Sequence, residues 1–227
     1  MGRSGMDPIQ RLMGLMFKAH PWHGVSIGEQ APDVVTSYIE IVPTDTVKYE
    51  VDKDSGFLKV DRPQRFSNVC PVYYGLIPQT YCGEKVAGLF GKRAKRKNMI
   101  GDGDPLDICV LTEKTIAHSD ILLTAIPIGG FSMADGGEAD DKIIAVMKDD
   151  AAYGDFKDIG DCPISLIDRL QHYFLTYKMA PGSVQHKVEI TSVYGREEAM
   201  KVIHASHADY RKKFPELESL WPKHMSV

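Results

Sequence analysis

Hydrophobic and polar positions alternate along much of this chain, and the pattern predicts a fold made mainly of short strands. Runs rich in β-branched and aromatic residues, each bounded by turn residues, indicate strands at residues 34–42, 46–53, 56–62, 106–111, 121–131, 142–148 and 188–194. No such pattern marks residues 73–80, which we expect to be irregular, or residues 82–100, which we expect to form a loop.

Two later segments have the spacing of helices. In residues 164–178 and again in residues 197–213, apolar side chains recur every three or four positions. Many short strands followed by two late helices favour a mainly β (α+β) fold, in which the strands form a small barrel and the helices pack outside it. Alternating strand–helix units around a parallel sheet fit this order poorly.

The composition is that of an ordinary globular protein. The 227 residues include 43% hydrophobic and 26% charged residues, and the net charge of −4 provides no general basic field for nucleic acid. No apolar run approaches the length of a membrane span. Four cysteines without a CxxC pair are typical of reduced thiols, and we expect a cytoplasmic protein. We expect an N-terminal extension at residues 1–33, with an amphipathic stretch at residues 9–17, and a single domain at residues 34–227.

Residues 102–107, with the sequence DGDPLD, place three aspartates within six positions, directly before an apolar run. Such close like charges repel one another, and hard cations such as Mg²⁺ and Ca²⁺ relieve the repulsion by taking carboxylate ligands. Asp102 and Asp104 share one strand face, whereas Asp107 has the opposite parity. A bend at the intervening glycine and proline would turn all three towards one point. For this segment alone, a solvated acidic turn is the simpler interpretation.

An EF-hand is excluded for the same segment. Leu106 falls where that loop needs a ligand, and Asp107 falls where it needs glycine.

Other charged and hydroxyl groups follow the same order of strands and helices. Asp140 and Lys142 share a strand face after a predicted hairpin turn that begins at Asp135. The remaining groups are Glu40, Lys48, Glu50, Arg62, Tyr74, Tyr177 and Lys178. Each group alone is equally consistent with surface ion pairs or core packing. Together, carboxylates for metal ions and cations for anions are the set that phosphoryl transfer to water requires.

In their order along the chain, these groups resemble the soluble family I inorganic pyrophosphatases of the bacterial type. The match runs from about residue 38 to residue 178 and centres on GDGDPLDICVL at residues 101–111. The resemblance implies hydrolysis of pyrophosphate to two phosphates with several Mg²⁺ ions, for which Mn²⁺ or Zn²⁺ can substitute. It also implies a five-stranded, OB-like closed barrel with flanking helices.

The resemblance implies a role for each matching residue. The metal ligands would be Asp102, Asp107, Asp135 and Asp140, and Asp104 would be the general base that takes a proton from the metal-activated water. The substrate-binding residues would be Lys48, Arg62, Tyr74, Lys142, Tyr177 and Lys178. Glu40 and Glu50 would lie next to these residues and hold them in position without contacting the metal ions or the substrate.

This chain departs from the shorter bacterial members in three respects. It has a longer insertion at residues 82–100, extended termini, and Cys70 where those members have tyrosine. The added segments leave a homo-dimer and a hexamer equally open. Pyrophosphate is the only expected partner besides further copies of the chain, with neither nucleic acid nor a membrane.

Two other functions are compatible with parts of the sequence. A nucleic-acid-binding module would use a barrel and the basic run at residues 92–97, but that run has no interleaved aromatic residues and is expected to be a solvated loop. A regulatory protein that binds divalent ions without catalysis would leave Lys48, Arg62 and Lys178 without a role.

Overall fold

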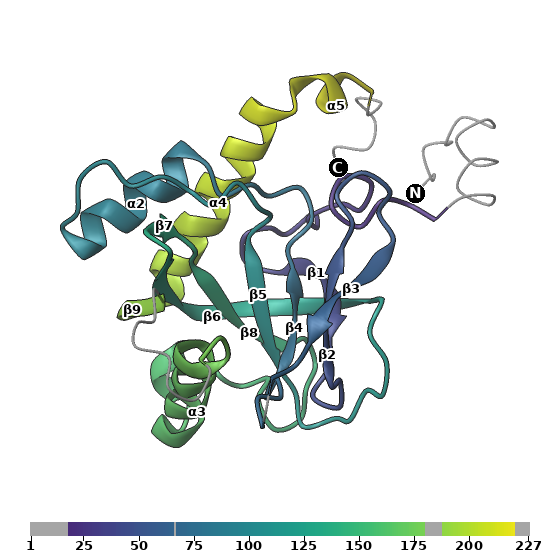
Figure 1. Cartoon of the computed structure of the whole chain (residues 1–227), viewed down its shortest axis with the longest axis vertical. Helices are drawn as coiled ribbons and strands as arrows, with labels where there is room; N and C mark the ends of the chain where they lie inside the picture. The colour runs from purple at the N-terminus through teal and green to yellow at the C-terminus, as the bar shows by residue number, and fades with distance from the viewer. Residues whose placement is uncertain (1–17, 66, 180–187, 221–227) are drawn as a thin grey trace.

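The computed structural model describes residues 18–65, 67–179 and 188–220 (Figure 1). The elements of these residues, in chain order, are β1 (Val35–Ile41), β2 (Val47–Val51), β3 (Leu58–Pro63), β4 (Tyr73–Leu76), α2 (Glu84–Ala94), β5 (Asp107–Leu111), β6 (Ile121–Asp135), β7 (Glu138–Ala139), β8 (Lys142–Met147), the 3₁₀ helix η1 (Ile159–Asp161), α3 (Ile164–Thr176), β9 (Val188–Gly195), α4 (Arg196–Lys213) and α5 (Pro215–Leu220).

Five strands pair in a closed ring, in the order β1, β4, β5, β8 and β6, with β6 pairing back to β1. β5 and β8 run parallel, and the other pairs of the ring are antiparallel. The long strand β6 closes the ring because its first part pairs with β1 and its later part with β8 and β9. Its register shifts between Pro127 and Gly129, and such a bulge bends a strand.

The strands β5 and β8 are buried on both faces, which explains their unbroken apolar sequences. On one face, Ile108 and Ile143 belong to a core cluster that includes Val202 of α4. On the other face, Cys109 and Ile144 belong to a cluster that includes Leu170 of α3. The two helices therefore cover opposite sides of this strand pair.

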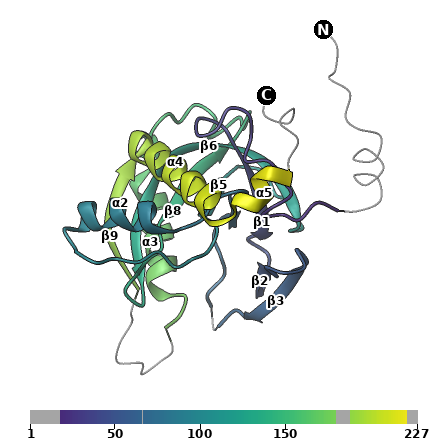
Figure 2. The ribbon, with the colours of Figure 1, turned by 90° about the horizontal axis from the view of Figure 1, so that it is seen from above.

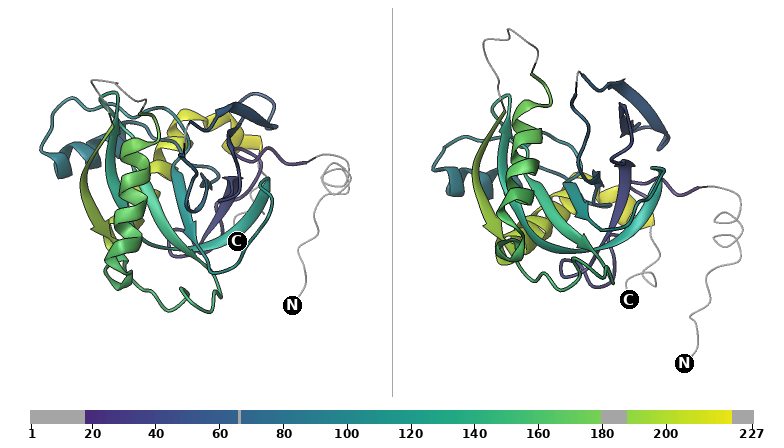
Figure 3. Two further views of the ribbon diagram at one scale, coloured as in Figure 1. Left: turned by 60° about the horizontal axis from the view of Figure 1, so that its bottom comes forward. Right: turned by 90° about the horizontal axis from the view of Figure 1, so that it is seen from below.

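The remaining elements lie around the ring. Seen from above, α2, α4 and α5 lie together on one side (Figure 2), and α2 packs against α4. The β2–β3 hairpin is a separate two-stranded sheet, and it stands out from the ring on the side where α3 also projects (Figure 3). Part of the expected N-terminal extension packs on the body, because the Trp22 indole donates to the Thr80 carbonyl at 2.7 Å and stands edge-on to Phe214. The predicted amphipathic stretch at residues 9–17 lies outside the described residues.

The predicted strands and both late helices are present close to their expected bounds. Two expectations are wrong. Residues 73–80, expected to be irregular, begin with β4, which is short and contains Gly75. Residues 82–100, expected to be a loop, contain α2, whose buried residues Val86, Ala87 and Phe90 have helical spacing. Glycines within α2 and the basic residues at its end hide this pattern, because glycine weakens any helix prediction.

Gly75 is required where β4 passes β1. A Cβ atom at this position would lie 1.8 Å from the Tyr38 carbonyl oxygen, so the two strands would have to separate.

We expect Gly75→Ala to destabilise the protein by about 1–3 kcal/mol or more, measured by urea denaturation. Gly88→Ala is the matched control, because a Cβ there meets nothing within 4 Å and Gly88 lies in α2. That variant should gain up to about 1 kcal/mol, and equal stability of both variants would contradict this account.

Candidate active site

A cavity of about 440 Å³ lies between the β2–β3 hairpin, the start of β5, the β7–β8 junction and the end of α3. The predicted site residues that line it are Glu40, Lys48, Glu50, Tyr74, Asp102, Asp104, Asp107, Asp135, Asp140, Lys142, Tyr177 and Lys178. Arg62 is the one predicted residue that does not line it. Side chains that the sequence spaces over more than a hundred positions are therefore gathered around one space.

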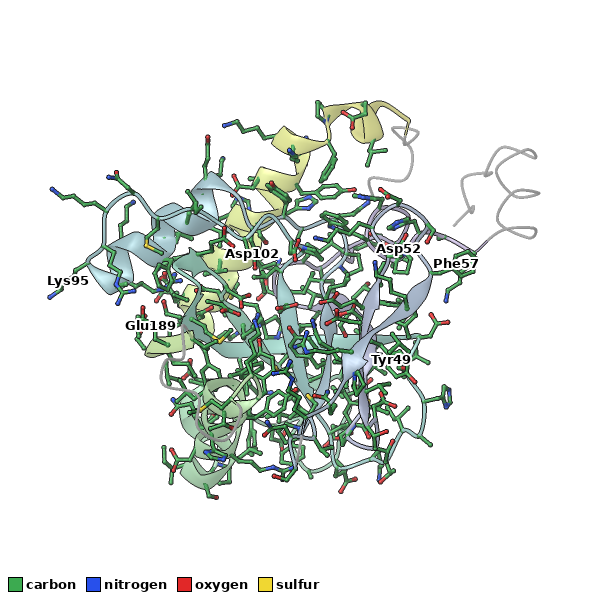
Figure 4. All side chains as sticks on the ribbon, viewed as in Figure 1. Tyr49, Asp52, Phe57, Lys95, Asp102 and Glu189 are labelled. Atoms are coloured by element: carbon green, nitrogen blue, oxygen red, sulfur yellow. The ribbon has the colours of Figure 1, made fainter. Side chains whose placement is uncertain are left out.

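The acidic segment at residues 102–107 bends as its glycine allows. Gly103 has a φ of +77°, a conformation that glycine adopts without strain, and the Asp104 amide donates to the Asp102 carboxylate at 3.0 Å. The bend changes the alternation of an extended strand. As a result Asp102, Asp104 and Asp107 all border the cavity, and Figure 4 shows Asp102 well inside the outline of the molecule, to the left of Asp52.

Lys142 is the buried centre of the site. Its ammonium donates to the carboxylates of both Asp107 and Asp140, and the residue is only 3% exposed. Burial lowers the pKa of Lys142, but the two carboxylates outweigh it and raise the pKa well above its usual value. The ammonium therefore stays charged, as a cation held between two anions.

If all were ionised, the carboxylates around Lys142 would carry more negative charge than one ammonium balances. Burial and the nearby Asp140 charge raise the pKa of Asp102 to about 8. Burial also raises the pKa of Asp140. Crowded carboxylates of this kind are stabilised when a further cation shares them.

Three other lysines at the cavity also contact carboxylates. Lys178 pairs with Asp135, Lys53 with Asp104, and Lys48 with Glu50. The Lys53 and Asp104 side chains are 54% and 47% exposed, so water screens this pair and its net stabilisation is small. Lys53 can therefore exchange partners at little cost.

Two tyrosines add neutral donors to the cavity. Burial, followed by the charge of Asp107, raises the pKa of Tyr74 well above its usual value. Burial likewise raises the pKa of Tyr177. Both hydroxyls therefore remain protonated and can donate hydrogen bonds to an anion.

Arg62 lies on the neighbouring hairpin instead of the cavity wall. It is opposite Lys48 in the β2–β3 ladder and donates to Asp61. Asp61 also lies 3.4 Å from the Lys48 ammonium. The Asp61 carboxylate therefore links Arg62 to a lysine that lines the cavity.

The cavity also includes residues that the sequence analysis did not assign to the site, among them Lys53, Glu138, Tyr173 and Phe174. Lys53 lies just beyond the end of β2, where strand alternation no longer applies. Tyr173 was accessible to prediction, because it precedes Tyr177 by one helical turn. Cys70 is buried beside Tyr173, and its thiol donates to the Val72 carbonyl at 3.4 Å.

The donor set fits a hard divalent cation, although the described residues contain no group of three or more His, Cys, Asp or Glu arranged as ligands. Asp102, Asp107 and Asp140 supply only carboxylate oxygens, which Mg²⁺ prefers, and soft ligands are not among them. In this arrangement the Lys142 ammonium contacts two of the three carboxylates.

The basic run at residues 92–97 is not a purely solvated loop. Lys92 and Arg93 belong to the last turn of α2, and Arg93 is largely buried in ion pairs with Asp141 and Glu198. The expectation of a solvated loop is therefore wrong for Arg93.

Among the described residues, no helix is both long and apolar enough to cross a membrane.

Comparisons with known proteins agree on one family. The family model described as inorganic pyrophosphatase matches residues 37–211. An inorganic pyrophosphatase of Chlamydia caviae is 54% identical over 199 residues, covering 86% of this chain and 92% of that protein. A soluble inorganic pyrophosphatase of Chlamydomonas reinhardtii is 38% identical over 197 residues, covering 86% and 91% of the two chains. The crystal structure of inorganic pyrophosphatase from Thermus thermophilus superposes with a TM-score of 0.71 at 30% identity, covering 84% of this chain and 99% of that one.

Glu40 makes the stability of this region depend on pH. It is 6% exposed, and its carboxyl accepts a hydrogen bond from the Val51 amide at 2.7 Å, which ties β1 to β2. Burial raises the pKa of Glu40 from 4.5 to about 8, so the folded state keeps a proton that the unfolded chain loses above pH 4.5. The free energy of unfolding should therefore fall between pH 4.5 and 8, by at most about 1.4 kcal/mol per pH unit from this group.

We expect Glu40→Gln, which keeps the acceptor but cannot ionise, to flatten this decline in urea denaturation at pH 5 to 8. Glu197→Gln is the control, because the pKa of that exposed carboxyl is lowered by Lys201. Parallel pH profiles for Glu40→Gln and the unaltered protein would contradict the assignment.

Proposed function

Because this chain belongs to the inorganic pyrophosphatase family, which hydrolyses pyrophosphate to phosphate, we propose that the cavity around Lys142 is the site of that reaction. The observation that supports this placement is the convergence of separate acidic and basic segments on one space. A pyrophosphate anion needs cations and hydrogen-bond donors, and its hydrolysis needs a positioned base.

Family I pyrophosphatases need a divalent metal, usually Mg²⁺. We propose that several ions bind here, held by Asp102, Asp107, Asp135 and Asp140, with Mn²⁺ or Zn²⁺ as possible substitutes for Mg²⁺. Ions bound in this way lower the pKa of water from ~16 towards ~7 and neutralise phosphate charge. The raised pKa of Asp102 and Asp140 supports the ligand set, since both carboxylates gain from an added cation.

Asp104 is the proposed general base. Its side chain is 47% exposed, whereas those of Asp107 and Asp140 are 20% and 12% exposed. A carboxylate near the mouth of the cavity can take a proton from water and pass it to solvent. Its weak contact with Lys53 can open as substrate enters, because that lysine can then turn to a phosphate oxygen.

The remaining residues would bind the two phosphates. Lys142 is the most buried of the three lysines, with 3% of its side chain exposed, against 18% for Lys48 of the hairpin and 39% for Lys178 just after α3. Tyr74 and Tyr177 would donate their hydroxyl protons, and Glu40 and Glu50 would hold the lysine-bearing strands in place. These donors stabilise the charge that grows on the leaving phosphate in the transition state.

Four further assignments belong to the same proposal. The ring of five strands corresponds to the OB-like closed barrel of the resemblance, which the pairing of β6 back to β1 supports. Residues 34–227 form one catalytic domain behind an extension at residues 1–33. The four buried cysteines are free, which supports a cytoplasmic location. A homo-oligomer, either a dimer or a hexamer, remains a prediction from the resemblance.

A phosphate-release assay tests the proposed function. Pyrophosphate, ATP and a phosphomonoester should be compared with Mg²⁺ and with a chelator. Of the three substrates, we expect only pyrophosphate to release phosphate rapidly, and only when Mg²⁺ is present. A protein that releases no phosphate from pyrophosphate with Mg²⁺ would disprove the proposal.

The role of Asp104 is tested in the same assay by Asp104→Asn. A positioned base contributes about 10²- to 10⁴-fold, so kcat should fall by that factor while circular dichroism stays unchanged. Asp168→Asn, at an exposed aspartate of α3, is the matched control and should retain full activity. Full activity of Asp104→Asn would remove this residue as the base.

Arg62 is proposed to reach the substrate from the hairpin, although it does not line the cavity in this arrangement. Loss of a charged hydrogen bond costs about 1.5–3 kcal/mol, so Arg62→Ala should raise KM for pyrophosphate about ten- to hundred-fold. Lys59→Ala on the same strand removes an exposed cation that pairs with Asp52, and it should leave KM unchanged. Equal KM values for both variants would exclude Arg62 from substrate binding.

A further inference from the structure

Arg93, in the last turn of α2, is bound on three sides by residues outside the cavity. Its guanidinium donates to the Asp141 carboxylate, to Glu198 of α4 at 2.9 Å, and to the Ser132 hydroxyl of β6 at 3.3 Å. The guanidinium also lies 4.8 Å from the centre of the Tyr194 ring. The insertion at residues 82–100 thereby places a cation against the main sheet.

Asp141, the acceptor of this contact, is 1% exposed. Its Oδ2 accepts hydrogen bonds from the Arg93 guanidinium and from the Tyr194 hydroxyl, the latter at 3.2 Å. Its Oδ1 has no hydrogen-bond partner. A buried carboxylate that loses its cation is strongly unfavourable. Arg93 is therefore the group that allows Asp141 to remain in the interior.

Asp141 stands between two cavity residues, Asp140 and Lys142, and its side chain points to the opposite face. Lys142 and Asp140 contact each other and line the cavity, whereas Asp141 contacts α2 and β9. A shift of the backbone at residue 141 would move Asp140 and Lys142 as well, because both are bonded directly to it in the chain. The contact with Arg93 and the cavity therefore lie on opposite sides of the same three consecutive residues, 140–142, where β8 begins.

The rest of the insertion is fixed to the same place. Phe90 of α2 is fully buried in a cluster with Ala134 and Ala139. The Ala139 amide donates to the Ile100 carbonyl at 2.8 Å, directly before Asp140. The insertion is thus anchored on the β7–β8 junction, and Arg93 is its one charged contact with the buried Asp141.

We propose that Arg93 is a positioning residue, which acts through Asp141 to hold Asp140 and Lys142 in the geometry that binds metal and phosphate. The inference rests on the proposed roles of Asp140 and Lys142. Without the guanidinium, the 140–142 segment would shift to bring the Asp141 carboxylate to water. The insertion, which by the resemblance is longer here than in the shorter bacterial members, would then hold the site in place from outside the cavity.

Arg93→Met tests the proposal, because methionine preserves much of the apolar side-chain volume and removes the charge. Residues that orient metal ligands typically change metal affinity or activity by about 10- to 100-fold. We expect Mn²⁺ binding, measured by titration calorimetry without substrate, to weaken by that factor. The value of kcat should fall similarly, with a smaller change in KM for pyrophosphate.

Arg196→Met is the matched control for a loss of stability alone. Arg196 is also partly buried, and it donates to the Pro127 carbonyl at 2.6 Å and to Asp33 at 3.1 Å, away from the cavity. It should lower the urea midpoint but leave Mn²⁺ affinity unchanged. An equal loss of Mn²⁺ affinity in both variants, or unchanged affinity in Arg93→Met, would overturn the proposal.

A double variant tests the route through Asp141. Arg93→Met combined with Asp141→Asn leaves no buried carboxylate without a cation, so it should fold even where Arg93→Met alone does not. If Arg93 acts through Asp141, the loss of Mn²⁺ affinity in the double variant should not exceed the larger single loss. Additive losses would overturn this route.

Asp140→Asn separates this inference from the function on which it rests. If Asp140→Asn binds Mn²⁺ normally, the proposed metal site is wrong. If Asp140→Asn loses Mn²⁺ binding while Arg93→Met keeps it, the site stands and only the role of Arg93 fails.

Discussion

The buried contact of Lys142 with Asp107 and Asp140 is the interaction on which the rest of this site depends. An ammonium removed from water is unfavourable unless anions surround it, and here two carboxylates do so. The pairing of β5 with β8 produces this contact, because Asp107 and Lys142 are direct partners in the parallel register. Parallel pairing brings the starts of both strands to one edge. The acidic segment before β5 and the β7–β8 junction before β8 must therefore meet there.

The chain between these two strands makes the parallel pair possible. After β5, the long strand β6 crosses to β1, bends at its bulge and returns along β8 to the cavity, where it ends at Asp135. The same strand therefore closes the ring and delivers a carboxylate to the site. α3 completes the opposite wall, since its buried face packs on β5 and β8 while its end carries Tyr177 and Lys178 to the cavity. Fold and site are built from the same strand pairings.

Local patterns in the sequence were sufficient to predict much of this arrangement. Alternation placed most strands, and it correctly put Asp140 and Lys142 on one face. The acidic and basic groups could be selected because their order matches a family, not because their spacing shows that they meet. The parallel register of β5 and β8 joins residues 35 positions apart, and no local pattern encodes such a pairing. β4 was missed because Gly75, which the close approach to β1 requires, weakens the local signal, and α2 was missed because Gly88 and Gly91 weaken it. Arg93 was assigned to solvent because its partners lie 39 or more positions away in the sequence.

Residues 140–142, at the junction that leads into β8, have charged side chains on two opposite sides of the backbone, and the two sides have different requirements. The cavity face of residues 140–142 needs an ammonium and a carboxylate that can rearrange around ligands, so its charges must not be locked into one set of contacts. The opposite face can be fixed, because nothing there has to bind or leave. Asp141 meets Arg93, Tyr194 and a tightly packed helix on that side. The fixed contacts of Asp141 hold the backbone of residues 140–142 in place. The side chains of Asp140 and Lys142 can therefore change partners at the cavity without a shift of the backbone.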